Sequence, residues 1–324
     1  MKNLEYFLTP TQDKLFKLLS KMYPGAVVSK GNYILVPGEA PVMLLAHLDT
    51  VHKEPVKTIC KSDGGGILMS PQGIGGDDRC GVYAIVTVHA RAEVKPWLLF
   101  TCNEEVGGKG ANVFCGHHSK GKLPDDLDGL KALIEIDRKG RNDAVYYDCA
   151  NTEFEEYITG KGFHTEFGSF SDISVVAPEL GVAAVNLSSG YYNAHTLHEY
   201  IDRKQLNSTV NKVLQIVTDA AAPEFSKYEY IEAYHFGRFG GLGYYGYGGW
   251  DYRYGELGGS DVDLTKIPKD IRDEYEMLLD YYTPEELDEL RAEQGDRVIP
   301  MLAESEFGED YLAWRDDKET EELK

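Results

Sequence analysis

Short, mostly apolar runs recur along the first 220 residues, and they constrain the fold more than any other feature. These runs, which are typical of strands buried on both faces, are residues 42–46, 97–101, 132–136 and 182–187. Two shorter β-like runs lie before the first of them, at residues 26–29 and 33–36. Helical spacing of apolar residues occurs at residues 10–22, 78–92, 153–158 and 203–220. Because strands and helices alternate, the sequence predicts a three-layer α/β sandwich with a mostly parallel, mixed central sheet.

The character of the chain changes after residue 222. Residues 236–259 contain ten glycines and five tyrosines, a composition that disfavours helices and packed strands. Residues 260–324 carry 22 acidic and eight basic residues, a net charge of −14 out of −21 for the whole chain. Helical patterns lie in this part at residues 268–282, 283–294 and 306–315. We therefore expect a compact domain over residues 1–222, a Gly/Tyr-rich linker over 223–259 and an acidic helical C-terminal region over 260–324.

Composition excludes several classes of function. A net charge of −21 disfavours a protein that follows nucleic-acid phosphates. No run reaches the eighteen or so apolar residues of a membrane helix, and the first residues lack the apolar stretch of a secretory signal. The five cysteines form no Cys-x-x-Cys pair, which favours reduced thiols over a disulfide framework. We expect a cytoplasmic protein that binds neither nucleic acid nor a membrane.

Acidic residues and histidines lie where the predicted strands end and where the next helices begin. They are His47, Asp49, Asp77, Asp78, Glu104, Glu105, Asp137 and His195. In open α/β sheets the carboxyl ends of the strands meet at one crevice, so these side chains should converge. Several carboxylates placed together repel one another unless a cation neutralises them. The sequence therefore predicts a metal site at this edge of the sheet.

The types of residue limit which metal is expected. Imidazoles and carboxylates without a thiolate cluster suit Zn²⁺, and they suit Mn²⁺ or Co²⁺ less specifically. The number of predicted ligands is enough for two divalent ions about 3.5–4 Å apart, with one carboxylate shared between them. No glycine-rich nucleotide loop is present, so no further cofactor is predicted.

The order of the motifs resembles the di-zinc exopeptidase superfamily, which includes zinc aminopeptidases, glutamate-type carboxypeptidases, tripeptide aminopeptidase and acyl-diaminopimelate hydrolases. The motifs are His-x-Asp from residue 47, Gly-x-Gly-Gly-Asp-Asp from 73, Asn-Glu-Glu-Val-Gly from 103, Glu-Ile-Asp from 135 and His-x-x-x-Glu from 195. The resemblance covers roughly residues 42–217 and does not reach the last 100 residues.

The resemblance implies a role for each residue of the set. His47 and Asp137 would hold one zinc, Glu105 and His195 the other, and Asp77 would bridge both. The bond between Asp77 and Asp78 resembles the cis peptide of the superfamily. Asp49 resembles the carboxylate that orients the first histidine, and Glu104 the general base. Ser171 and Asp172 are similar to a Ser/Thr-Asp element near the substrate.

Two departures from the superfamily bear on specificity. Only 57 residues separate Asp137 from His195, and only 29 separate His47 from Asp77. Neither gap is long enough for the extra domain that other members insert there, because such a domain needs about 50 residues or more beyond the strands and helices of the fold itself. The sequence thus predicts a compact catalytic core, with specificity set by loops or by the C-terminal region.

The resemblance implies a metal-dependent exopeptidase, an aminopeptidase or a dipeptidase, that acts on small peptides. Two alternatives remain open: an N-acyl amino-acid deacylase or desuccinylase, and a binding or structural protein that retains the fold. His198 is an alternative to His195 as a ligand. His117 and His118 lie in a Gly-, Ser- and Lys-rich stretch that predicts a solvated loop. The acidic C-terminal region is a candidate for self-association or for binding a protein partner.

Overall fold

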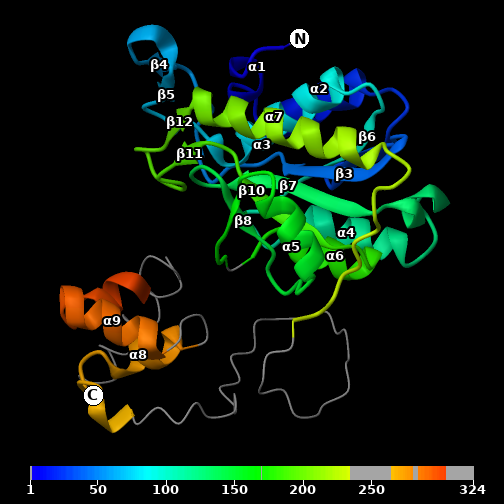
Figure 1. Cartoon of the computed structure of the whole chain (residues 1–324). Helices are drawn as coiled ribbons and strands as arrows, with labels where there is room; N and C mark the ends of the chain where they lie inside the picture. The colour runs from blue at the N-terminus through cyan, green and yellow to red at the C-terminus, as the bar shows by residue number, and fades with distance from the viewer. Residues whose placement is uncertain (1, 169, 234–263, 280–283, 304–324) are drawn as a thin grey trace. The chain divides into compact units, whose positions relative to one another are not determined.

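The computed structural model describes residues 2–168, 170–233, 264–279 and 284–303. The chain divides into two compact units, Met1–Tyr234 and His235–Lys324 (Figure 1). The predicted helix at residues 306–315 and the Gly/Tyr-rich stretch at 236–259 lie outside the described residues.

The first unit contains both predicted kinds of element in alternation (Figure 1). Its helices are α1 (Glu5–Leu8), α2 (Gln12–Met22), α3 (Gly76–Arg91), α4 (Lys109–His118), α5 (Thr152–Thr159), α6 (Ile173–Leu180) and α7 (Arg203–Ala220). Its strands are β1 (Val27–Ser29), β2 (Tyr33–Val36), β3 (Ala40–His47), β4 (Cys60–Lys61), β5 (Ile67–Met69), β6 (Pro96–Thr101), β7 (Ala132–Arg138), β8 (Asp143–Val145), β9 (His164–Thr165), β10 (Ala184–Ser188), β11 (Tyr191–Tyr192) and β12 (Tyr200–Asp202).

Eight strands form the central sheet, in the order β1-β2-β6-β3-β7-β10-β8-β9. The central strands β6, β3, β7 and β10 are parallel to one another, whereas β2 pairs with β6, and β8 with β10, in antiparallel fashion. The predicted mixed, mostly parallel sheet is therefore confirmed. The carboxyl ends of the four central strands consequently lie at one edge of the sheet.

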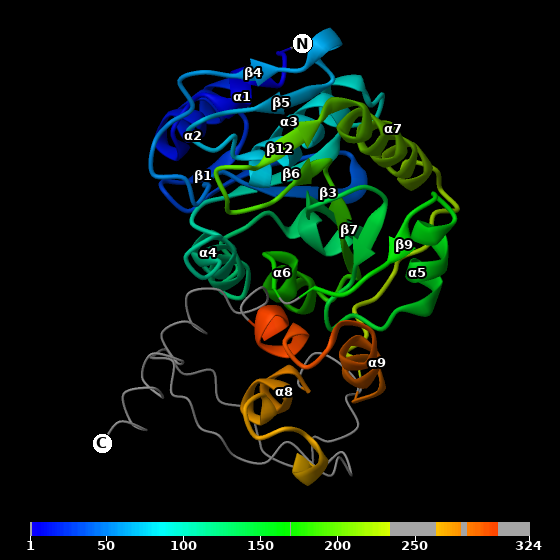
Figure 2. The same ribbon diagram turned by 90° about the vertical axis from the view of Figure 1, so that its left-hand side faces the viewer.

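Helices cover both faces of this sheet, which gives three layers (Figure 2). On one face, α2, α3 and α7 pack on the sheet through residues such as Leu15, Ile85 and Val213. On the other face, α4 and α6 pack through residues such as Phe114 and Val176. Burial of these apolar side chains is the main favourable contribution to folding. The predicted three-layer architecture is confirmed.

One prediction about local structure is wrong. His117 and His118 end helix α4 and are partly buried, instead of lying in a solvated loop. The Tyr33 hydroxyl lies 2.6 Å from His117 Nδ1, and His118 Nδ1 lies 2.7 Å from Glu179 Oε1. The helix forms because Phe114 is fully buried against the sheet, so packing outweighs the low helix propensity of the glycines.

A smaller antiparallel sheet has the order β11-β12-β5-β4. It joins the segment that follows β3 to the segment that carries His195, which lies between β11 and β12. The compact unit also includes residues 223–233: the Tyr228 amide donates to the Lys131 carbonyl, and Glu229 forms a bridge with Val182.

The second unit has its own small apolar core. It contains a 3₁₀ turn at Leu264–Lys266 and the helices α8 (Arg272–Leu278) and α9 (Pro284–Gln294), within two of the stretches predicted to be helical. Tyr275, Leu278 and Leu287 are fully buried in this core.

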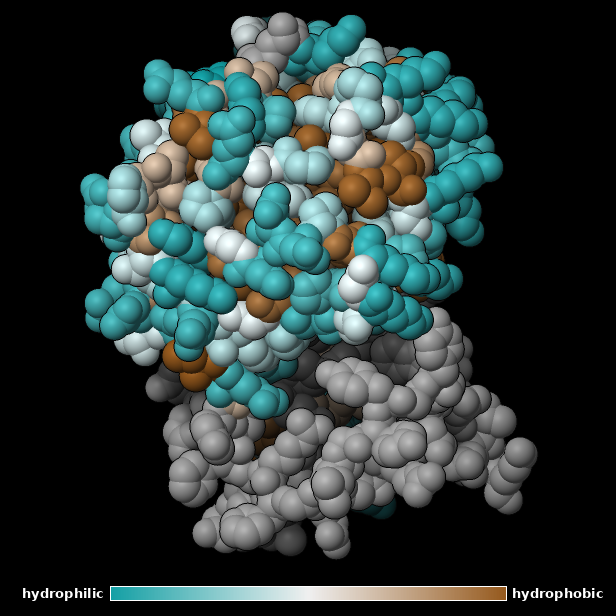
Figure 3. All heavy atoms as spheres, turned by 90° about the vertical axis from the view of Figure 1, so that its right-hand side faces the viewer, coloured by the Kyte–Doolittle hydropathy of each residue, from teal (hydrophilic) through white to brown (hydrophobic). Residues whose placement is uncertain are grey.

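The sequence predicts no membrane helix and no disulfide framework, and two observations on the described residues concern these predictions. No described helix is both long enough and apolar enough to span a membrane. All five cysteines are free. Figure 3 shows one face of the first unit, on which hydrophilic residues predominate and hydrophobic residues form small groups.

Candidate metal centre

The parallel strands bring the predicted residues together at one edge of the sheet. His47 is the last residue of β3, and Asp137 lies near the end of the neighbouring strand β7. Glu104 and Glu105 follow β6, which flanks β3 on its other side. Asp77 is the second residue of α3, and the loop between β11 and β12 brings His195 to the same edge.

The first cluster is centred on His47, which is fully buried. His47 Nε2 lies 3.1 Å from Asp77 Oδ1 and 3.5 Å from Asp137 Oδ1. Its other ring nitrogen, Nδ1, lies 3.3 Å from Asp49 Oδ1. Asp49 therefore lies at ion-pair distance from Nδ1 while Nε2 faces the cluster, the arrangement expected of a metal-binding imidazole.

The second cluster shares Asp77 with the first. His195 Nε2 lies 3.2 Å from Asp77 Oδ2 and 3.2 Å from Glu105 Oε2. One carboxylate thus presents one oxygen to each histidine. In each cluster, the candidate ligand atoms lie within 4.8 Å of one another. The exposed His198 belongs to neither cluster. His195, and not the alternative His198, is therefore the histidine that lies beside the carboxylates.

The peptide bond between Asp77 and Asp78 is cis, as the resemblance implies. Asp78 is fully buried, and its Oδ1 accepts a hydrogen bond of 2.8 Å from the Gly81 amide. Gly81 has no space for a side chain, because an added Cβ would lie 2.2 Å from the Ile136 carbonyl oxygen. The start of α3 is therefore packed tightly against β7.

Asp49 contacts more than the imidazole it is expected to orient. Its Oδ1 accepts a hydrogen bond of 3.1 Å from the Glu104 amide, and its Oδ2 accepts one of 3.1 Å from the Glu105 amide. The His47 ring and, after it, the Glu104 amide hold the pKa of Asp49 below its usual value in spite of burial. One carboxylate therefore fixes both a candidate ligand and the turn that carries Glu104 and Glu105.

Glu104 lies at the edge of the first cluster, with Oε2 3.9 Å from His47 Nε2. Burial and the surrounding negative charges raise the pKa of the Glu104 carboxyl to about 8. A carboxyl whose pKa lies near neutrality is suited to accept and release a proton. This pKa is that of the metal-free protein, and the role of Glu104 as general base stays a prediction, supported by its position at the edge of the first cluster.

The clusters have the chemistry of a cation site. Four carboxyl groups and two imidazoles converge, and Glu105 Oε1 and Asp137 Oδ1 are buried without a hydrogen-bond partner. Burial and the charge of Asp77 raise the pKa of Asp137 well above its usual value. Hydrogen bonds to Asp77 and Glu105 raise the pKa of His195 to about 10. Divalent cations would satisfy the unpaired oxygens and compensate this negative charge, so the residues present fit the metal that the resemblance implies.

Ser171 and Asp172 are almost fully buried, and Ser171 lies beside Asp137 of the first cluster. The Ser171 hydroxyl donates to Glu135 Oε2, and its oxygen lies 3.4 Å from Asp137 Oδ2. Asp172 Oδ2 accepts a hydrogen bond from the Thr101 hydroxyl. Both side chains therefore have partners within the protein, and their contact with a substrate stays a prediction.

Sequence reasoning gave no role to three polar residues around the site. Glu135 is fully buried on β7, and burial and the charge of Asp172 raise its pKa to about 8. Asn186 Oδ1 accepts a hydrogen bond of 2.8 Å from the Asp137 amide. Gln12 contacts the residue before Glu104. Glu135 could have been noticed, since it stands two residues before Asp137 on the same face of a strand.

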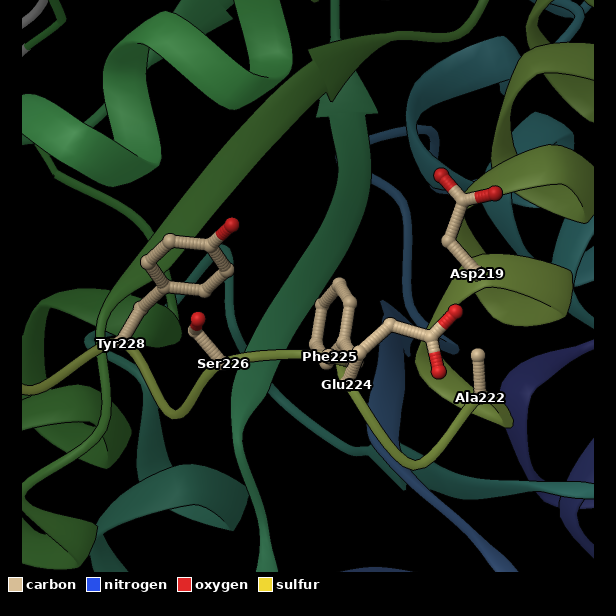
Figure 4. Close-up of a pocket in the computed structure, with 6 residues that line it drawn as sticks. All are labelled: Asp219, Ala222, Glu224, Phe225, Ser226 and Tyr228. Atoms are coloured by element: carbon tan, nitrogen blue, oxygen red, sulfur yellow. The ribbon is translucent and has the colours of Figure 1, made fainter.

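A surface hollow lies away from these clusters (Figure 4). It is lined by Asp219, Ala222, Glu224, Phe225, Ser226 and Tyr228. Lys131, just before β7, donates from Nζ to the Phe225 carbonyl at 2.6 Å. The hollow is thus at the beginning of β7, whereas Asp137 is near its end, so the hollow takes no part in the candidate metal centre.

Comparisons with known proteins bear on the fold of the chain. No protein-family model and no curated protein sequence matches the chain. Among solved structures, an aminopeptidase PepT from Bacillus cereus matches with a TM-score of 0.51 and 15% identity, over 68% of this chain and 99% of that chain. A tripeptidase from Staphylococcus aureus matches with a TM-score of 0.50 and 15% identity, over 67% of this chain and 96% of that chain. The chain therefore has the fold of these two peptidase structures, which is the fold that its motifs predict.

Proposed function

We propose that this protein is a metal-dependent exopeptidase, an aminopeptidase or a dipeptidase, that uses two divalent ions. The observation that carries the proposal is Asp77, whose two carboxylate oxygens lie 3.1 Å from His47 Nε2 and 3.2 Å from His195 Nε2. A carboxylate shared between two imidazole–carboxylate clusters is the arrangement of a two-metal hydrolytic site. The fold shared with an aminopeptidase and a tripeptidase supports the same class of reaction.

Each ion would have its own protein ligands. We assign His47 and Asp137 to one ion, Glu105 and His195 to the other, and Asp77 to both. Zinc suits this set best, and manganese or cobalt fits the same ligands less specifically. Ions bound there would lower the pKa of a water molecule and polarise the carbonyl of the scissile amide.

The protein's own residues supply the proton transfer and the positioning. Glu104 accepts the proton of the attacking water and passes it to the leaving amine. Asp49 accepts a hydrogen bond from the Glu104 amide and lies 3.3 Å from the His47 ring, so it links the base to the first cluster. Asn186 fixes the backbone of Asp137.

A comparison of substrates tests the proposal and separates its alternatives. The zinc-loaded protein is incubated with di-, tri- and pentapeptides that carry a free amino terminus, and with the same peptides after N-acetylation or N-succinylation. We expect release of residues from peptides with a free amino terminus. Cleavage confined to the acylated compounds would favour the deacylase. A metal-loaded protein that cleaves neither set would favour a binding protein that retains the fold.

The acidic C-terminal region is proposed to act as a cap or as a self-association element that shapes access to the site. Its support is the absence of room for an inserted lid between the ligands, and the small helical core that this region forms by itself. Truncation after Tyr234 tests this role. We expect a changed KM for long peptides or a changed mass in solution, with zinc binding retained. An unchanged KM and an unchanged mass in solution would place this region outside catalysis.

The five free cysteines support our further proposal of a cytoplasmic location.

A further inference from the structure

The N-terminal turn between α1 and α2 is bonded to the segment that begins with Asp77. Arg79, two residues after Asp77, donates from Nη1 to the Phe7 carbonyl at 2.9 Å and to the Pro10 carbonyl at 2.8 Å. Phe7 belongs to α1 and is fully buried in the same apolar core as Ile85 of α3. Helix α1 lies on the side of the sheet that α3 covers (Figure 1). Arg79 is almost completely buried, and the two carbonyls take the place of water as partners of its Nη1.

The same N-terminal segment also reaches the turn that carries Glu104. Gln12, the first residue of α2, forms a pair of hydrogen bonds with Asn103 across 91 positions of sequence. Its Oε1 accepts from the Asn103 amide at 3.0 Å, and its Nε2 donates to Asn103 Oδ1 at 3.1 Å. Asn103 has a φ of 60°, a left-handed conformation that costs energy unless contacts hold it.

Three consecutive backbone amides are fixed by side chains at this turn. Gln12 accepts from the amide of Asn103, and Asp49 accepts from the amides of Glu104 and Glu105. Asp49 comes from the segment after β3, and Gln12 comes from the N-terminal segment. Side chains from two distant segments therefore bind the backbone amides of residues 103–105, directly after β6.

We propose that Gln12 is a positioning residue for Glu104 and Glu105. This inference rests on the proposed function, because it assigns Glu104 to proton transfer and Glu105 to metal binding. Gln12 touches neither substrate nor metal in this account. It acts through Asn103, by fixing the direction in which the chain enters the turn. Small misplacements of a catalytic group lower the rate of the chemical step more than they lower the binding of substrate.

The position of Gln12 makes a local test practical. Helix α2 has its own anchors in the core, since Leu15 and Leu19 are fully buried. Gln12 itself is only partly buried, so its replacement leaves the packing of α2 in place. Lys14 on the same helix is exposed and provides a matched control.

The experiment compares the full-length wild type with Gln12→Ala, Gln12→Glu and Lys14→Ala. The first readout is amide hydrogen exchange over residues 101–106, measured in the metal-free protein. We expect Gln12→Ala to speed exchange of the Asn103 amide about fivefold or more, since it loses its acceptor. Gln12→Glu should retain protection, because a carboxylate still accepts from this amide and, after a flip of the Asn103 side chain, from its NH₂ group.

The second readout is steady-state kinetics of the zinc-loaded protein. We expect Gln12→Ala to lower kcat about tenfold while KM stays within about twofold of the wild type. Lys14→Ala should match the wild type in exchange and in both kinetic constants. A kcat of Gln12→Ala equal to that of Lys14→Ala would overturn the proposal.

Hydrogen exchange keeps this inference separate from the proposed function. If the wild type cleaves no peptide, the proposed function fails. The inference is then decided by exchange and by zinc affinity, measured by competition with a chromophoric chelator. Gln12→Ala should weaken zinc binding about threefold or more, because Glu105 stands on the same turn. Unchanged exchange and unchanged zinc affinity in Gln12→Ala would overturn the inference whether or not the protein is a peptidase.

Discussion

Glu199 fixes the backbone of Asp77: its Oε1 accepts a hydrogen bond of 3.0 Å from the Asp77 amide, across 122 positions of sequence. Its other oxygen, Oε2, lies 2.9 Å from both the Gly75 amide and His52 Nε2. Glu199 is fully buried. The carboxylate thus holds the turn that presents Asp77, and it stands four residues after His195. The spacing of His195 and Glu199 therefore couples one candidate ligand to the position of the shared one.

Replacing this carboxylate should destabilise the protein. In Glu199→Gln, the side-chain NH₂ group cannot accept a hydrogen bond, so a buried backbone amide loses its partner. We expect the free energy of unfolding of the metal-free protein to fall by about 1–3 kcal/mol. Urea unfolding measures this change, and Glu224→Gln, at an exposed position, is the control. Equal stability of the two variants would show that Glu199 does not fix the turn.

The role split between the adjacent glutamates gives a second prediction. Glu104→Gln removes the group that accepts the proton but leaves the ligand set complete. We expect kcat to fall by about 10²–10⁴-fold, with the zinc content unchanged. The exposed Glu93→Gln should retain both values. A normal kcat in Glu104→Gln at full zinc occupancy would refute the assignment of the base.

The stability of the metal-free protein should fall as pH rises from 6 to 9. Burial raises the pKa of Glu104 to about 8, and hydrogen bonds to Asp77 and Glu105 raise that of His195 to about 10. Both groups hold a proton in the folded state at pH values where the unfolded state has lost it. The stability they contribute is therefore lost as pH rises through these values.

The lowered pKa of Asp77 acts in the opposite direction, but its contribution is lost only at acidic pH, below about 4. Urea midpoints measured with a chelator at pH 6, 7.5 and 9 test this prediction. Zinc should reduce the slope, because it binds the deprotonated ligands. A midpoint that is constant or rising with pH in the metal-free protein would contradict the described electrostatics.

Much of the first unit can be predicted from local pattern. The strands β3, β6 and β7 are mostly apolar because nearly all of their residues are buried. Helix α7 matches its predicted bounds, since Asp202 caps its first turn by accepting from the Lys204 and Gln205 amides. The strand ends then place His47, Glu104 and Asp137 at one edge of the sheet, which is why the candidate site could be predicted as well.

The remaining features depend on contacts between distant residues. Strands β4, β9 and β11 have two residues each, too few to give a period. Helix α4 forms because Phe114 packs into the core, although its sequence is rich in glycine. The contacts of Gln12 with Asn103, and of Glu199 with Asp77, join residues 91 and 122 positions apart. No local pattern marks such partners, so only the folded structure identifies them.

The central claim is that Asp77 is shared between two metal ions. Elemental analysis after dialysis against trace zinc tests it most directly, on the wild type, Asp77→Ala, His195→Ala and the exposed control His164→Ala. We expect about two zinc ions per chain in the wild type and the control, one in His195→Ala and close to none in Asp77→Ala. A wild type without zinc, or an Asp77→Ala variant that still holds two ions, would contradict it.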